Sequence, residues 1–277
     1  MTTTPTTTGY LELDGGRLYY EMAGQGETLV LGHAGFVDRR MWDDQWAAFT
    51  PHYRVIRFDL RGYGQSDPLE GPVSRRDDLR RLLEHLEVER AVLIGCSMSG
   101  EAVLDYTLEH PDKVTALVLV STVPTGFEMQ GPPPPNLMEM IGALQQGDLD
   151  QASELQLRIW VDGSFRQPEQ VDPSVRQRAA AMNRIGVGNG TWAKADSQPL
   201  DPPEPPALPR LGEVDVPTLI IAGALDHPEI LRAADVMAAE IPDARKIILP
   251  DSAHVPNMEQ PAAFNQAVLQ FLASIQS

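Results

Sequence analysis

Residues 91–105 constrain the fold of this chain more than any other stretch. Residues 91–94 are all apolar and two of them are β-branched, which is typical of a strand covered on both faces, and good helix formers follow Met98. Joining a strand to a helix within one or two residues requires a tight turn, here at Ser97, and only small neighbours leave such a turn open. The neighbours are small: Gly95, Ser99 and Gly100. The turn would lift the Ser97 hydroxyl clear of the backbone, beside the free amides of a helix N-terminus, so Ser97 is a candidate nucleophile.

Strand and helix patterns alternate through both ends of the chain. Alternating or apolar runs predict a hairpin over residues 9–23 and further strands at 27–33, 53–59, 91–96, 114–120, 216–222 and 245–249. Helical spacing appears between them, at 39–49, 74–86, 98–110, 229–240 and 260–275. Because the inner strands are almost entirely apolar, the sequence predicts an α/β fold with a mostly parallel sheet that helices cover on both faces.

The alternation breaks in the middle of the chain. Proline clusters at 132–135 and 202–209 bracket three segments with helical spacing, 136–146, 149–161 and 174–185. Proline-rich segments act as stiff spacers. The sequence therefore predicts a helical cap, residues 124–212, inserted into an α/β core made of residues 1–123 and 213–277.

The predicted nucleophile needs two partners, because a serine hydroxyl is weak until a base accepts its proton and a third group orients that base. Packing alone explains many serines in glycine-rich turns, so the partners decide how Ser97 is interpreted. His254 follows the last predicted strand and Asp226 follows the strand before it. Both would lie at the carboxyl edge of the sheet, where ligands of open α/β sheets gather. Asp251, near His254 in sequence, is the alternative acid, and His227 is predicted at the surface.

The order Ser97, Asp226, His254 and several short motifs resemble the α/β-hydrolase superfamily over nearly the whole chain. The motifs that carry the resemblance are residues 33–35, 59–67, 95–100, 223–226 and 252–254. The resemblance implies an eight-stranded, mostly parallel sheet with an inserted helical cap, and it makes the three residues a catalytic triad. In this family His33 is normally a structural part of its turn. The run from 33 to 42 and the length of the insert look most like small carboxylesterases and enol-lactonases.

By the same resemblance, the backbone amides of Gly35 and Met98 would form the oxyanion hole. Two positions depart from the family pattern. Ala34 replaces the usual glycine, which leaves the amide of Phe36 as an alternative second donor. Ser99 also stands where the pattern has glycine, and because serine is small we expect a turn of altered tightness with its function retained.

The cap is predicted to contribute to the substrate pocket, since a lid must present some apolar surface to its ligand. Trp160, Met138 and Met182 lie in the insert. Each of these residue types is more often part of a core than of a pocket wall. We nevertheless expect them to line the pocket together with Phe36.

The acidic composition limits the possible partners. A formal charge of −17, from 22 basic and 39 acidic residues, repels nucleic acid and anionic membranes. Cys96 is the only cysteine, which excludes an intrachain disulfide and a zinc site built on thiolates, and its place before the turn predicts a buried side chain. We expect no signal peptide and no membrane span, and therefore a cytoplasmic protein. We further expect a monomer or small homo-oligomer that acts on a small molecule.

These features favour a serine hydrolase that cleaves carboxylic esters, small or short-chain ones, through an acyl-enzyme on Ser97, with no metal and no organic cofactor. Dehalogenases and epoxide hydrolases with this scaffold carry an aspartate at the turn, so the serine argues against both. Three alternatives stay open at this point. A lactonase and a hydrolase of carbon–carbon bonds would use the same triad, and a ligand receptor could retain the hydrolase fold.

Overall fold

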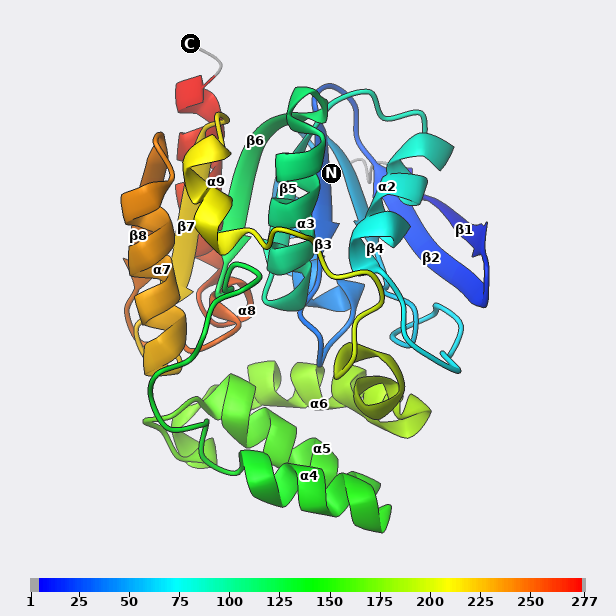
Figure 1. Ribbon diagram of the computed structural model, residues 1–277, viewed down its shortest axis with the longest axis vertical. Coiled ribbons are helices and arrows are strands. Elements are labelled where there is room, and N and C mark those ends of the chain that lie inside the picture. Colours follow the sequence, from blue (N-terminus) through cyan, green and yellow to red (C-terminus); the bar gives the residue numbers. More distant parts are fainter. Residues whose placement is uncertain (1–4, 276–277) are drawn as a thin grey trace.

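A single mixed sheet forms the centre of the molecule (Figure 1). The computed structural model describes residues 5–275. Within these residues, eight strands pair in the order β1-β2-β4-β3-β5-β6-β7-β8. Their bounds are Thr7–Leu13 (β1), Gly16–Ala23 (β2), Thr28–Gly32 (β3), Arg54–Phe58 (β4), Ala91–Cys96 (β5), Val114–Val120 (β6), Thr218–Gly223 (β7) and Ala244–Leu249 (β8). β2 pairs antiparallel with β1 and β4, and all other neighbours are parallel, which confirms the predicted mostly parallel sheet.

Helices cover both faces of this sheet, as the sequence predicted (Figure 1). One face carries α2 (Arg75–His85), α3 (Met98–Glu109) and α7 (Pro228–Glu240). The other face carries α1 (Asp43–Phe49) and α9 (Pro261–Ile275), which follows the short α8 (Pro256–Glu259). In β5, Leu93 packs on the α2 side while Val92 and Ile94 pack on the α1 side, which explains why the strand is apolar throughout. No helix in residues 5–275 is long and apolar enough to cross a lipid bilayer.

The segment between β6 and β7 is helical and lies across one end of the sheet (Figure 1). It contains α4 (Leu137–Gln146), α5 (Leu149–Leu157) with a π-helical turn at Arg158–Asp162, and α6 (Pro173–Asn189). These helices confirm the three predicted ones. A second π-helical turn at Trp192–Asp196 was not predicted. The two ends of the segment are joined at Thr125, which accepts hydrogen bonds from the amides of Ala207 (2.8 Å) and Leu208 (2.9 Å). The division into a core and a cap domain stays a prediction.

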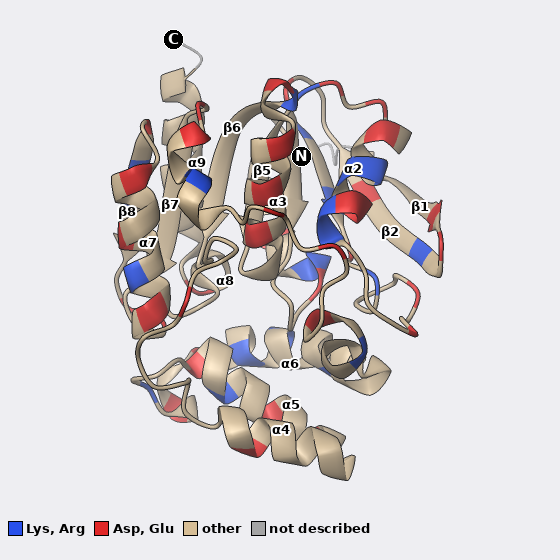
Figure 2. Ribbon diagram, viewed as in Figure 1, with Lys and Arg blue, Asp and Glu red and all other residues tan. Residues whose placement is uncertain are grey.

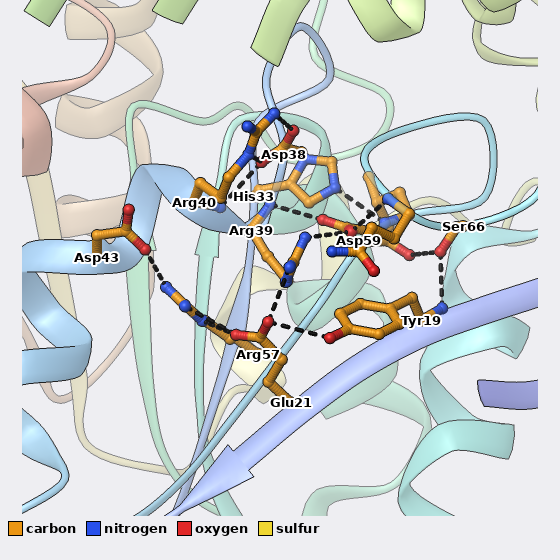
Figure 3. A network of polar contacts seen from close by, with 12 residues as sticks. Tyr19, Glu21, His33, Asp38, Arg39, Arg40, Asp43, Arg57, Asp59 and Ser66 are labelled. Carbon is orange, nitrogen blue, oxygen red and sulfur yellow. Dashed lines mark hydrogen bonds and ion pairs between the residues drawn. The ribbon is translucent and has the colours of Figure 1, made fainter. Parts of the chain in front are cut away.

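Short 3-10 helices complete the connections, at Arg39–Trp42, Pro111–Lys113, Pro168–Gln170 and Leu208–Glu213. The first of them contributes to a buried polar network beside the loop after β4 (Figure 3). Arg39 forms ion pairs with Glu21 (2.7 Å) and Asp59 (2.8 Å), and Arg57 forms a second ion pair with Glu21 (2.7 Å). Asp59 also accepts hydrogen bonds from the amides of Arg39 and Gln65, each at 2.8 Å. Removing one partner would leave a buried charge unpaired, so this network holds the loop in one geometry.

Candidate active site

Ser97 stands at the corner between β5 and α3, as the sequence predicted. Its backbone has φ 53° and ψ −119°, a conformation whose strain is on the order of 1–3 kcal/mol for a residue with a side chain. A side chain on Gly95 would collide with the backbone of Ser99, and one on Gly100 would collide with Thr122, so both glycines are required for closure. The Thr122 hydroxyl donates to the Ser97 carbonyl at 2.7 Å. Packing therefore maintains a strained serine at the carboxyl edge of the sheet, as is common at functional positions.

Ser99, which replaces the glycine of the family pattern, forms an attachment of its own. Its side chain is buried, and its hydroxyl donates to the carbonyl of His33 at 2.6 Å. A glycine at this position could not form the bond. The serine thus ties the beginning of α3 to the turn that follows β3, where the second oxyanion donor is predicted.

The structure brings His254 and Asp226 together. His254 Nδ1 lies 2.8 Å from Asp226 Oδ2, and each residue is 1% exposed. The other oxygen of Asp226 accepts a hydrogen bond from the amide of His227 at 2.7 Å. His227 is buried and caps α7, so the prediction that it lies at the surface was wrong: its Nδ1 is needed to accept the Glu229 amide. Asp251, the alternative acid, is exposed.

This pairing sets the state of the His254 ring. Because Nδ1 faces a carboxylate, Nδ1 carries the proton and Nε2 is left as an acceptor. Nε2 is buried and has no hydrogen-bond partner in the described residues, so the hydrogen bond that links a base to its nucleophile is not formed with Ser97 in this structure. Such bonds are often long before substrate binds.

Two aromatic rings hold the imidazole of His254 in place. The ring of Trp160 lies 4.6 Å from it, centroid to centroid, and that of Phe36 lies 6.3 Å from it. The His254 amide also donates to the Trp160 carbonyl at 3.3 Å. Trp160 belongs to the helical insert and Phe36 to the turn after β3, so the insert and the core together cover this histidine.

The two residues whose amides are the predicted oxyanion donors, Gly35 and Met98, are neighbours in space. Met98 is the first residue of α3, so its amide has no acceptor within the helix, and the Met98 side chain occupies the space that a side chain on Gly35 would need. The amide of Phe36, the alternative donor, is already used, because it donates to the Ala34 carbonyl at 2.9 Å. The Gly35 amide has no acceptor among residues 5–275. The geometry therefore favours Gly35 over Phe36 as the second donor.

His33 is built as a structural residue, as expected. Its Nε2 accepts a hydrogen bond from the Leu60 amide and its Nδ1 donates to the Ala34 carbonyl, both at 2.8 Å. Complete burial lowers the pKa of His33 to about 4, so the ring stays neutral at physiological pH. Cys96 is also buried, and burial raises the pKa of its thiol well above the usual range, which disfavours a thiolate nucleophile.

The four predicted pocket residues are placed in different surroundings. Trp160 covers His254, and Phe36 lines a small cavity of about 20 Å³. Met182 is 2% exposed and packs in the core that joins the insert to the sheet. Met138 is 70% exposed on α4, which corrects the expectation that it lines the pocket. It lies two positions, about 200° of helical rotation, from the buried Met140, so the two methionines face opposite ways.

Residues 27–261 match the family model of the alpha/beta hydrolase fold. The chain belongs to this family. A 2-hydroxy-6-oxo-6-phenylhexa-2,4-dienoate hydrolase of Burkholderia cepacia is 27% identical over 93% of this chain and 92% of the relative. A pimeloyl-[acyl-carrier protein] methyl ester esterase of Pectobacterium carotovorum is 28% identical over 92% of this chain and 98% of the relative. The enol-lactonase from Burkholderia xenovorans LB400 shares the fold, with a TM-score of 0.77, 24% identity, and coverage of 96% and 100% of the two chains. The fold is thus confirmed, and these relatives are named for different reactions.

Two residues that are not among the predicted site residues brace the turn that follows β3. The Tyr63 hydroxyl donates to the carbonyl of Gly35 and lies 2.5 Å from the Asp196 carboxylate of the insert. Asn183 of α6 donates to the carbonyl of Phe36 at 2.9 Å. Tyr63 lies within the 59–67 motif, which already pointed to this part of the chain. A single buried asparagine in α6 belongs to no such motif.

Proposed function

We propose that this hydrolase cleaves carboxylic esters with Ser97 as the nucleophile, His254 as the general base and Asp226 as the group that orients the base. The observation that carries the proposal is the buried Asp226–His254 pair, which lies at the same sheet edge as the strained Ser97. The Nε2 of His254 has no hydrogen-bond partner in the described residues. A base with one nitrogen fixed and the other free is suited to accept the serine proton.

The reaction would proceed in two steps. Ser97 Oγ attacks the ester carbonyl while its proton moves to His254 Nε2, and the amides of Gly35 and Met98 stabilise the negative charge on the carbonyl oxygen. The alcohol leaves with the proton from His254, and an acyl-enzyme remains on Ser97. Water, deprotonated by the same Nε2, then releases the acid. A cavity of about 270 Å³ beside Ser97 and Met98 is consistent with a small or short-chain ester.

Hydrolysis of a carbon–carbon bond or of a lactone is the second candidate. It is supported by the names of the Burkholderia cepacia and Burkholderia xenovorans relatives, and it would use the same three residues. The ester is preferred because the cavity beside Ser97 carries more carboxyl groups than arginines, which is unfavourable for a dienoate substrate with a free carboxylate.

The test is Ser97→Ala, assayed on aryl esters of increasing acyl length, a lactone and a dienoate. We expect the variant to lose activity about 10³-fold or more in kcat, because the nucleophile and its base act as one unit. Cys96→Ala is the matched control, since the adjacent thiol is the other conceivable nucleophile, and it should retain activity within about threefold.

Each outcome decides a different part of the proposal. Ester hydrolysis at the parent rate by Ser97→Ala would overturn the assignment of the nucleophile. Turnover of the dienoate or the lactone but of no simple ester would select the second candidate. Absence of any turnover by the parent, with submicromolar binding of a small ligand, would indicate a receptor.

A further inference from the structure

The cavity beside Ser97 has an unusual charge balance. Two arginines and four carboxyl groups line it, and its other walls are mainly small or apolar. Both arginines already have partners: Arg75 pairs with Asp196 at 2.6 Å, and Arg76 pairs with Asp201 at 3.1 Å and with Glu109 at 3.0 Å. Among residues 5–275, no cationic side chain of this lining is therefore left without a counter-ion.

The remaining two carboxyl groups, Glu101 and Asp105, both come from α3. They lie one turn apart, so both side chains project from the same side of the helix as the cavity. Figure 2 shows that the Asp and Glu residues of α3 lie along one side of the helix, and α3 contains no Lys or Arg. Neither residue forms an ion pair within the part of the chain that the structure describes.

Their surroundings differ in detail. Asp105 is 6% exposed, and within the described residues only its Oδ1 has a partner, the Thr125 hydroxyl, which donates to it at 2.8 Å. The Glu101 side chain is partly buried and makes no hydrogen bond within residues 5–275. Carboxyl groups shielded from water are normally paired, so two that line this cavity with no ion pair of their own leave a place for a cation supplied by the ligand.

We propose that Glu101 and Asp105 bind the positively charged group of a cationic ester, so that this hydrolase prefers esters carrying a fixed positive charge to uncharged esters of the same shape. The proposal rests on the proposed esterase function and names its substrate class. Glu101 is one turn beyond Ser97, which places the charged group beside the reacting carbonyl in the same cavity.

The protonation of the pair supports this assignment. Burial and the neighbouring charge of Asp105 raise the pKa of Glu101 to about 8. Burial raises the pKa of Asp105 to about 6, although the hydrogen bond from Thr125 and the charges of Arg76 and Arg210 lower this pKa. Arg75, Asp196 and Asp201 face the same cavity. A bound cation favours the ionised form of Glu101, so the preference for a cationic ester should increase as the pH rises from 7 to 9.

The experiment compares two esters of the same shape. Butyrylcholine carries a quaternary ammonium, and 3,3-dimethylbutyl butyrate has carbon in place of that nitrogen. A second pair, the ethyl esters of 4-(trimethylammonio)butanoate and 5,5-dimethylhexanoate, places the charge in the acyl arm. The quantity measured at pH 9 is the ratio of kcat/KM for the charged ester to that for the uncharged one, taken for the pair with the larger ratio.

We expect a ratio of about ten or more in the parent protein, because one charge pair in a partly buried site contributes on the order of tenfold in affinity. Glu101→Gln should lower the ratio about tenfold and change kcat/KM for the uncharged ester less than about threefold. Glu139→Gln, which removes an exposed carboxylate from α4, should leave the ratio unchanged.

A parent ratio near one, or a ratio that Glu101→Gln does not change, would overturn the proposal while leaving the esterase function in place. If none of the four esters is hydrolysed, the proposed function fails instead. The Ser97→Ala protein then provides the test through binding: calorimetry should find tighter binding of butyrylcholine than of its uncharged counterpart, and equal binding would refute the role of Glu101.

Discussion

Two buried histidines at strand ends of this hydrolase are built in opposite ways. His33, after β3, is fully buried, and both of its ring nitrogens have backbone partners, from Ala34 and Leu60. His254, after β8, is 1% exposed, and its ring nitrogen Nδ1 is paired with Asp226. Its Nε2 is unpaired within the described residues.

The difference separates a structural histidine from a candidate base. A ring with both nitrogens committed cannot accept a proton without breaking a hydrogen bond, and burial further disfavours its charged form. A ring held at one nitrogen by a carboxylate can accept a proton at the other, because the carboxylate stabilises the resulting cation. The hydrogen bonds of each ring, rather than its burial, therefore distinguish the two roles.

The largest expected effect tests the base. His254→Gln should lower kcat for ester hydrolysis about 10³–10⁴-fold, because no other group would accept the serine proton. Ester hydrolysis is measured at pH 8, and circular dichroism checks that the fold is retained. His52→Gln, an exposed histidine, serves as the control and should keep full activity. Retention of more than about a tenth of the parent activity would remove His254 from the mechanism.

The second effect tests the structural role of His33 through the pH dependence of stability. Its pKa of about 4 in the folded protein lies below the ordinary value of 6.5, so the unfolded chain binds a proton first as the pH falls. The stability that this residue contributes is complete above pH 6.5 and is lost as the pH falls toward 4, by about 3 kcal/mol.

His33→Gln removes this titration. The unfolding free energy is measured by urea unfolding at pH 7 and at pH 4. Between these two pH values, the variant should lose about 3 kcal/mol less unfolding free energy than the parent. Other groups titrate in both proteins and cancel in the comparison. An equal loss in parent and variant would mean that His33 is not held neutral by burial.

The smallest effect concerns the hydrogen bond that ties the beginning of α3 to the turn after β3. Ser99→Ala removes the hydroxyl that donates to the His33 carbonyl, so we expect a loss of about 1–2 kcal/mol in unfolding free energy and a several-fold lower kcat. Ser121→Ala is the matched control, because that buried hydroxyl, at the end of β6, has no partner in residues 5–275. Equal effects of the two substitutions would show that the Ser99 bond contributes nothing particular.

Much of the framework follows from local patterns. The apolar run of β5 and the small residues around Ser97 predicted the corner, because strand coverage and turn sterics act between near neighbours in the chain. The position of Asp226 and His254 after parallel strands predicted that they lie at the same edge, since all parallel strands end there. The choice of Asp226 over the nearer Asp251 also agrees with the observed hydrogen bond.

Only the tertiary structure decided which side chains meet across the site. Met138 and Met140 are equally apolar, so the rotation of α4 alone decides that Met140 is buried and Met138 exposed. The Ser99–His33 bond and the partners of Arg75 and Arg76 join residues far apart in sequence, which a local pattern does not encode. The sequence by itself thus determined the strand ends and their chemical groups. Packing between distant segments decided which of those groups are paired and which, as the Nε2 of His254 and the carboxyl of Glu101, have no hydrogen-bond partner within the described residues.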